Sequence, residues 1–165
     1  MKIQVGDIFE FQVNENSKSY GQIVDVPNKD SLVIIIFEGQ YRYRPDLVEL
    51  LKDNVLFFGI SLDAKFYHKH WIIIGNNTSN ISDIKFPYYK IGVDTVYIEN
   101  FEGNRLRKAS IAEELALQYR TVIAPVRFEL ALKAYYKQIE WKDKYNHMLY
   151  SEMVKGIQLV EGKTA

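Results

Sequence analysis

The sequence contains no cysteine and no excess of charge of either sign. Without cysteine the chain can form no disulfide, hold no metal through a thiolate and use no thiol nucleophile. Lysine and arginine together number 21, as do aspartate and glutamate, so no net charge draws the chain towards nucleic acid or an anionic membrane. These absences exclude disulfide scaffolds and speak against proteins that bind through an overall basic surface.

Long hydrophobic runs are also missing. The longest, residues 32–37, is far shorter than the roughly 20 residues that a membrane-spanning helix needs. Residues 1–7 have neither the apolar stretch nor the small-residue cleavage site of a signal peptide. We therefore expect a cytoplasmic protein that makes no contact with a membrane.

What the chain does have is enough apolar sequence for one packed core. It has 165 residues, of which 47% are apolar, and at that length a domain buries about 70% of its unfolded surface. There are 12 tyrosines. Tyrosine is common at the rim of a core and at interfaces, because its ring can be buried while its hydroxyl stays hydrated. We predict a single domain over residues 1–160, with a frayed tail at residues 161–165.

Residues 1–108 read mostly as β-strands. Residues 5–13 and 20–26 predict a hairpin, in which Phe9 and Phe11 face the core while Glu10 and Gln12 face water. The continuous apolar run at residues 32–37 predicts a strand covered on both faces. Further strands are expected at residues 54–62 and 71–74, and a second hairpin at residues 94–100 and 104–107.

The hydrophobic period changes after residue 109, and residues 110–156 read mostly as helical. Ser110 and Glu113 have the spacing of a capping box, which predicts a helix over residues 112–119. Residues 121–124 return to strand composition, and Pro125 suits the first position of another helix. Either one long bent helix or two consecutive helices would then end near Gly156.

Strands first and helices last are typical of the α+β class. We predict a bent antiparallel sheet or a partial β-barrel, with the C-terminal helices packed against it. An aromatic zone around Tyr135, Trp141 and Tyr145 either packs these helices onto the sheet or helps to dock a partner.

No pattern for catalysis, metal or cofactor binding stands out. His68 and His70 would share a face in a strand, but no further ligand follows at a metal-binding spacing, and His147 is the only other histidine. There is no glycine-rich phosphate loop, nucleophile elbow or HExxH helix, and the spacing of the carboxylates selects no acid–base pair. We predict a protein with no catalytic residue, no metal and no cofactor.

The segment Tyr41-Arg42-Tyr43-Arg44 raises an alternative function. Interleaved aromatic and basic residues on a small sheet can stack bases and hold phosphates. Strand alternation instead places the tyrosines inward and the arginines outward, and the neutral net charge gives no support for nucleic-acid binding. A small β-barrel that binds nucleic acid or a small ligand stays as the alternative.

Several segments, taken in order, resemble immunity protein family 26 of bacterial polymorphic toxin systems. They are a Gly6-Asp7 entry to the first strand, Tyr20-Gly21 in the second, the tryptophan strand Trp71–Gly75, the step Phe86-Pro87, and Ala124-Pro125 before a helix. The resemblance covers about residues 3–132. It implies a small cytoplasmic protein that binds a cognate toxin domain and blocks it without performing chemistry.

The same resemblance directs attention to acidic residues, because charge complementarity speeds association with a basic toxin. The densest acidic neighbourhood is formed by Glu99, Glu102, Glu113 and Glu114. We predict these four as a partner-binding face. The alternative is that they are hydrated carboxylates of a hairpin and of a helix start, where the helix dipole favours them. The oligomeric state and the identity of the toxin stay open.

Overall fold

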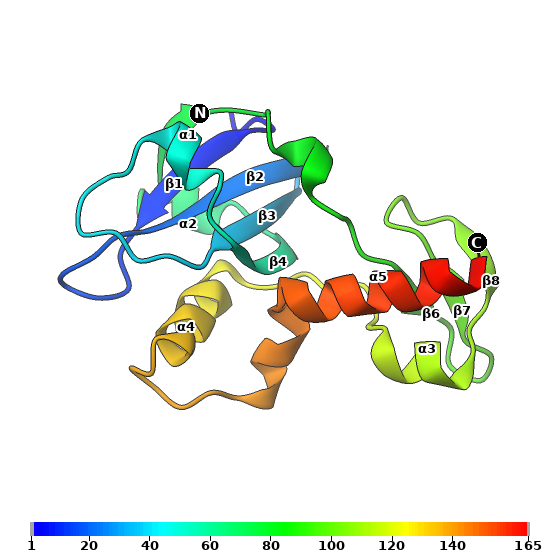
Figure 1. Ribbon diagram of the computed structural model, residues 1–165. Helices are drawn as coiled ribbons and strands as arrows, with labels where there is room; N and C mark the ends of the chain where they lie inside the picture. Colours follow the sequence, from blue (N-terminus) through cyan, green and yellow to red (C-terminus); the bar gives the residue numbers. More distant parts are fainter. Residues whose placement is uncertain (1, 165) are drawn as a thin grey trace.

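Two open antiparallel sheets organise the chain in a computed structural model that describes residues 2–164 (Figure 1). The larger sheet has the strand order β4-β3-β2-β1-β5, and the smaller sheet has the order β6-β7-β8. The strands are β1 (Asp7–Phe11), β2 (Ser19–Asn28), β3 (Ser31–Phe37), β4 (Val55–Ser61), β5 (Ile72–Asn76), β6 (Tyr89–Ile91), β7 (Tyr97–Glu99) and β8 (Arg105–Lys108). The predicted α+β class is confirmed, and neither sheet closes into a barrel.

Short helices connect the strands, and longer ones follow them. The helices are α1 (Leu47–Leu50), α2 (Ala64–Tyr67), α3 (Ile111–Ala116), α4 (Pro125–Tyr135) and α5 (Tyr150–Thr164), with 3₁₀ turns η1 (Ile81–Asp83) and η2 (Asp143–Met148). We call β6, β7, β8 and α3 (residues 89–116) the small lobe. In Figure 1 it lies to one side of the larger sheet, and α5 runs from that sheet to the small lobe.

Apolar side chains cover both faces of the larger sheet. One face carries Phe9, Ile34 and Phe57, which pack with Phe128 and Leu132 of α4. The other face has its own buried cluster, whose members include Ile8, Tyr20, Val33, Ile35, Phe37 and Phe58. The prediction that residues 32–37 are covered on both faces is confirmed.

The expectation that Glu10 faces water is wrong, whereas Gln12 is exposed as predicted. Glu10 is only 8% exposed, and its carboxylate accepts hydrogen bonds from Arg44 Nε at 2.9 Å and from the Tyr20 hydroxyl at 2.7 Å. Lys18 also pairs with it at 3.0 Å. These contacts, chiefly the one from Arg44, lower the pKa of Glu10 to about 2. A buried carboxylate is tolerated here because cationic and hydroxyl donors surround it.

The alternation predicted for residues 41–44 is also wrong. Among these four residues only Tyr41 makes a β-bridge, an isolated one to Lys18. Without a strand ladder the side chains need not alternate between two faces. Arg44 therefore reaches Glu10, while Tyr43 is 77% exposed.

The helical half departs from prediction at two points. The helix after Ser110 ends at Ala116 rather than near residue 119. Of the two alternatives for the residues after Pro125, the structure has two helices, α4 and α5, which are separated by residues 136–149, where Lys137 adopts a positive φ of 64°. The end predicted near Gly156 is wrong, because α5 continues through it to Thr164. The fraying expected for residues 161–165 stays a prediction, and Ala165 lies outside the described residues.

Gly21 allows β2 to approach the ring of Phe9. A Cβ atom at Gly21 would collide with Phe9 Cζ and would lie 2.7 Å from the carbonyl oxygen of Ile35. Both neighbours are fully buried, so they have little room to move. This close approach gives a physical reason for the glycine that follows Tyr20.

We therefore expect Gly21→Ala to lower the free energy of unfolding by about 1–3 kcal/mol, as overpacked core substitutions do. Urea denaturation followed by circular dichroism measures this loss. Gly162→Ala is the matched control, because a Cβ atom at Gly162 would meet nothing within 4 Å and alanine favours a helix such as α5. Equal stabilities of Gly21→Ala and the native chain would contradict the packing described for β2.

Candidate functional site

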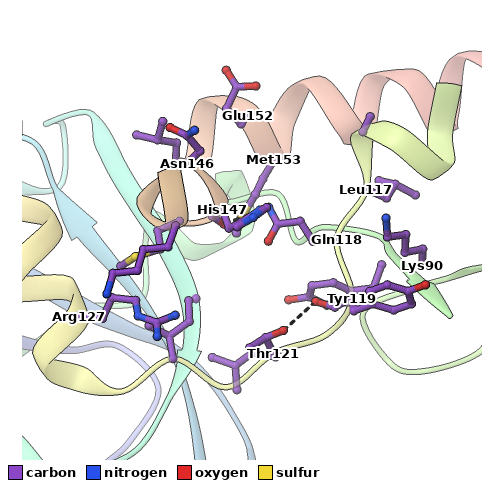
Figure 2. A pocket seen from close by; sticks show the side chains of 18 of the residues that line it. Lys90, Leu117, Gln118, Tyr119, Thr121, Arg127, Asn146, His147, Glu152 and Met153 are labelled. Carbon is purple, nitrogen blue, oxygen red and sulfur yellow. Dashed lines mark hydrogen bonds between the residues drawn. The ribbon is translucent and has the colours of Figure 1, made fainter. Parts of the chain in front are cut away.

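A cleft of about 700 Å³ opens between the larger sheet and the small lobe (Figure 2). On the side of the larger sheet it is lined by Gly59 and Ile60 of β4 and by Arg127 of α4. Lys90 of β6 and Tyr119 line the opposite side, and His147 lies between the two sides in Figure 2. We call this hollow the interlobe cleft.

Residues 117–123 form a wall of the interlobe cleft by attaching to both sheets. Lys90 and Tyr119 form a parallel bridge on the small-lobe side, and Ile60 and Val122 form another on β4. The backbone N–H of Ile123 donates to the carbonyl oxygen of Ile60 at 2.7 Å. Because β4 is the edge strand of the larger sheet, this bond satisfies a backbone group of β4 that no neighbouring strand reaches. The strand composition of residues 121–124 thus has a partner in β4.

Helix α5 holds the two sides of the cleft together. Near its start, Tyr150 and Met153 pack with the buried cluster of the larger sheet. Nearer its end, Val160 is buried with Ile98 and Leu117. The helix passes close to the chain after α3, since a Cβ atom at Gly156 would lie 3.2 Å from Leu117 Cδ2. The spacing of the two lobes is therefore set by a continuous helix.

Positive side chains outnumber negative ones along the interlobe cleft. Its lining includes the cationic side chains of Lys90, Arg127 and Lys144, and one carboxylate, Glu152. That carboxylate is paired with Lys155 at 3.0 Å. The cleft therefore presents a positive local charge although the whole chain is neutral.

Among the three cationic side chains of the cleft lining, Arg127 has the fewest partners within the protein. Its side chain is half-buried and makes no hydrogen bond or ion pair with the rest of residues 2–164. By contrast, Lys90 Nζ donates to the carbonyl oxygen of Glu114 at 2.8 Å and lies 5.0 Å from the Tyr119 ring centre. Lys144 lies 5.8 Å from the ring centre of Tyr145. Arg127 and Lys144 are thus the charged groups most available to a ligand.

Apolar side chains surround these charges. Leu115 of α3 is 82% exposed although it is large and aliphatic, and Tyr119 is about half exposed. Buried or half-buried Ile123, Met148 and Leu149 also line the cleft. A hollow with apolar lining and a few convergent polar groups is typical of a binding site.

The four glutamates predicted as a partner-binding face have different environments. Glu99 is buried and pairs with Arg120 at 3.1 Å. Glu113 is fully buried, while Glu102 and Glu114 are exposed. Two of the four carboxylates are thus engaged inside the protein, and a binding role for this set stays a prediction.

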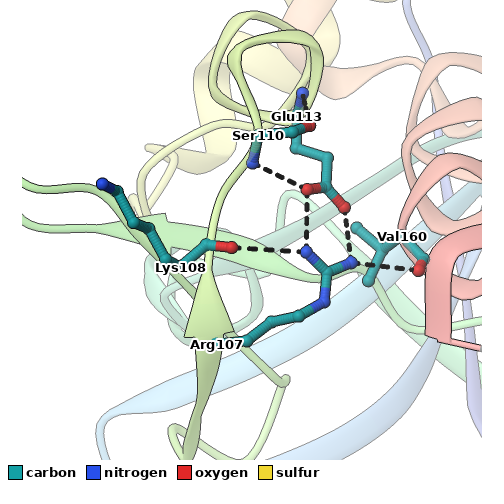
Figure 3. A network of polar contacts seen from close by, with 5 residues as sticks. All are labelled: Arg107, Lys108, Ser110, Glu113 and Val160. Carbon is teal, nitrogen blue, oxygen red and sulfur yellow. Dashed lines mark hydrogen bonds and ion pairs between the residues drawn. The ribbon is translucent and has the colours of Figure 1, made fainter.

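Glu113 joins three elements of the structure (Figure 3). Its carboxylate accepts hydrogen bonds from Arg107 Nη1 at 2.9 Å and Nη2 at 2.6 Å, and also caps α3 through the backbone N–H of Ser110. Arg107 Nη2 donates as well to the carbonyl oxygen of Val160 in α5, at 3.2 Å. The hydrogen bonds from Arg107 are the main reason that the pKa of Glu113 falls to about 2. The predicted capping box is confirmed and forms part of a wider network.

The histidines considered as metal ligands are exposed after α2. The rings of His68 and His70 have centres 6.2 Å apart. Across residues 2–164 no group of three or more histidine, cysteine, aspartate or glutamate side chains could hold a metal ion. None of the helices in this part of the chain combines the length and apolar character needed to span a bilayer.

These features define an α+β protein with a preformed cleft between two sheets. The family model of Immunity protein 26 matches residues 4–96, which is more than half of the chain, and the protein therefore belongs to this family. The match ends before β7, so Pro125, the last motif of the sequence resemblance, lies beyond it. Comparisons with curated proteins and with solved structures gave no match.

Proposed function

We propose that this protein is an immunity protein that binds and neutralises a cognate bacterial toxin domain in the cytoplasm, without catalysing a reaction. The observation that carries the proposal is membership of the immunity protein 26 family. The side chains around the interlobe cleft support it, because aromatic, aliphatic and arginine groups in one place are typical of the centre of a protein interface. Among the predicted glutamates, the exposed Glu102 and Glu114 can contribute at the rim of such an interface.

Co-expression tests this proposal. The toxin partner to test is a toxin-like C-terminal domain encoded immediately upstream of this gene. We expect that domain alone to stop growth, and co-expression of this protein to restore growth and to yield a complex that co-purifies. Tyr67→Ala is a suitable control, because Tyr67 is 76% exposed and lies outside the interlobe cleft, so the variant should still protect. Failure both to restore growth and to co-purify with such a neighbour would refute the immunity role.

The alternative function, a module that binds nucleic acid or a small ligand, has one structural feature in its favour. The volume of the interlobe cleft, about 700 Å³, lies within the usual range of small-molecule sites, and its lining is cationic. Titration with single-stranded oligonucleotides and with inorganic phosphate tests it. Binding of either in the micromolar range, with no binding of the neighbouring toxin domain, would replace the immunity proposal.

A further inference from the structure

We propose that the interlobe cleft receives an acidic segment of the toxin, whose carboxylates pair with Arg127 and Lys144. This inference rests on the proposed function and names the surface and the chemistry of the contact. It differs from the acidic face considered from the sequence, because it assigns the negative charge to the partner and the positive charge to this protein.

The first argument is the unmatched charge of Arg127. Arg127 is a half-buried residue in the lining of the cleft, yet its guanidinium has no ion pair within the described chain. Its planar fork of donors fits a carboxylate with two parallel hydrogen bonds. An incoming aspartate or glutamate would therefore supply the partner that the protein itself does not provide.

The second argument is the set of charges that line the cleft together with Arg127. Lys144 of η2 and Lys90 of β6 are positive. The only carboxylate in the lining, Glu152 of α5, is already paired with Lys155. The field inside the cleft thus favours a negative group and opposes a basic one.

The third argument separates a protein segment from a free anion or a nucleic acid. Leu115 and Tyr119 expose apolar surface at the edge of the cleft, and the half-buried Leu149 lies in the same lining. A phosphate ion makes no use of apolar surface, whereas an acidic segment with apolar neighbours would bury it. Nucleic acid needs cations along a length of backbone, and here they gather in one hollow of a neutral chain.

The test measures the affinity of the full chain for the neighbouring toxin domain by titration calorimetry. We expect Arg127→Glu to weaken binding by about tenfold or more, because reversal of a central charge opposes the partner's carboxylate. Lys144→Glu should also weaken binding. Because Lys144 is exposed on η2, this second variant keeps the test valid if Arg127→Glu fails to fold. Arg42→Glu is the matched control: Arg42 is exposed and outside the cleft lining, so its reversal should leave affinity within about threefold.

The outcomes separate the two proposals. If the native chain binds the toxin domain but folded Arg127→Glu and Lys144→Glu bind as tightly as Arg42→Glu, the cleft assignment is overturned and the immunity role stands. If the native chain does not bind the domain, both proposals fail. Restored binding of Arg127→Glu by a toxin variant with one acidic residue changed to arginine would support the direct pairing. Displacement of the toxin by millimolar phosphate or by an oligonucleotide would show that the cleft recognises an anion other than a protein carboxylate. That result would overturn the cleft assignment.

Discussion

Replacement of Trp71 by alanine is expected to lower the free energy of unfolding by about 3–5 kcal/mol, the range for buried tryptophan truncations. Trp71 lies just before β5, is 1% exposed, and stacks on Phe9 with ring centres 4.8 Å apart. Phe66 meets its ring edge-on at 5.4 Å. Its indole N–H also donates to Glu129 of α4 at 3.3 Å, so the substitution removes a link between the larger sheet and the helix that covers it.

Urea denaturation followed by far-ultraviolet circular dichroism measures this effect. Tyr67→Ala serves as the control, since Tyr67 lies close in sequence but is mostly exposed, and surface substitutions of this kind change stability by less than about 0.5 kcal/mol. An equal, small effect of the two substitutions would show that Trp71 is not part of the core.

The second large effect is expected from Glu113→Gln. Loss of the buried carboxylate leaves Arg107 without its ion pair, although that side chain is 31% exposed and can regain some water. We therefore expect a loss of about 2–4 kcal/mol near neutral pH, somewhat below the range for fully buried pairs. The glutamine amide can still accept the hydrogen bond from Ser110, so the variant mainly removes the charge.

The difference in stability between the native chain and Glu113→Gln should depend on pH. Folding lowers the pKa of Glu113 from 4.5 to about 2, so the folded state favours the ionised carboxylate. Its contribution is complete above pH 4.5 and is lost as the pH falls towards 2. Denaturation at a series of pH values measures this trend, with Glu114→Gln as control because Glu114 is exposed on the same helix. A difference that stays constant from pH 6 to pH 2.5 would contradict the ion pair.

Local spacing in the sequence was sufficient where neighbours along the chain decide the structure. The spacing of Ser110 and Glu113 predicts the cap of α3, and Pro125 marks the start of α4. The apolar run at residues 32–37 predicts a strand that is buried on both faces. In these cases the residues that carry the signal lie within a few positions of one another, so a period or a short motif captures it.

The features that sequence reasoning missed depend on contacts between distant residues. Glu10 can be buried because Arg44, from a segment without strand pairing, donates to its carboxylate. No local sequence pattern predicts that contact. Gly156 reads as a helix end, but the close approach of Leu117 gives it a packing role inside α5. Arg127 and Lys144 come together at one cleft only through the fold, and their spacing in sequence carries no signal.

The continuous helix α5 has a consequence for the speed of binding. Its 15 residues span about 22 Å at 1.5 Å per residue, and it is anchored in the cores of both lobes. The cleft is thus open and shaped before a partner arrives, and capture need not wait for the lobes to close. If the partner is acidic, as proposed, association is then limited by diffusion, and the attraction of the cations raises its rate at low ionic strength. For a protein proposed to intercept a toxin, a short time to capture matters as much as the strength of the final complex.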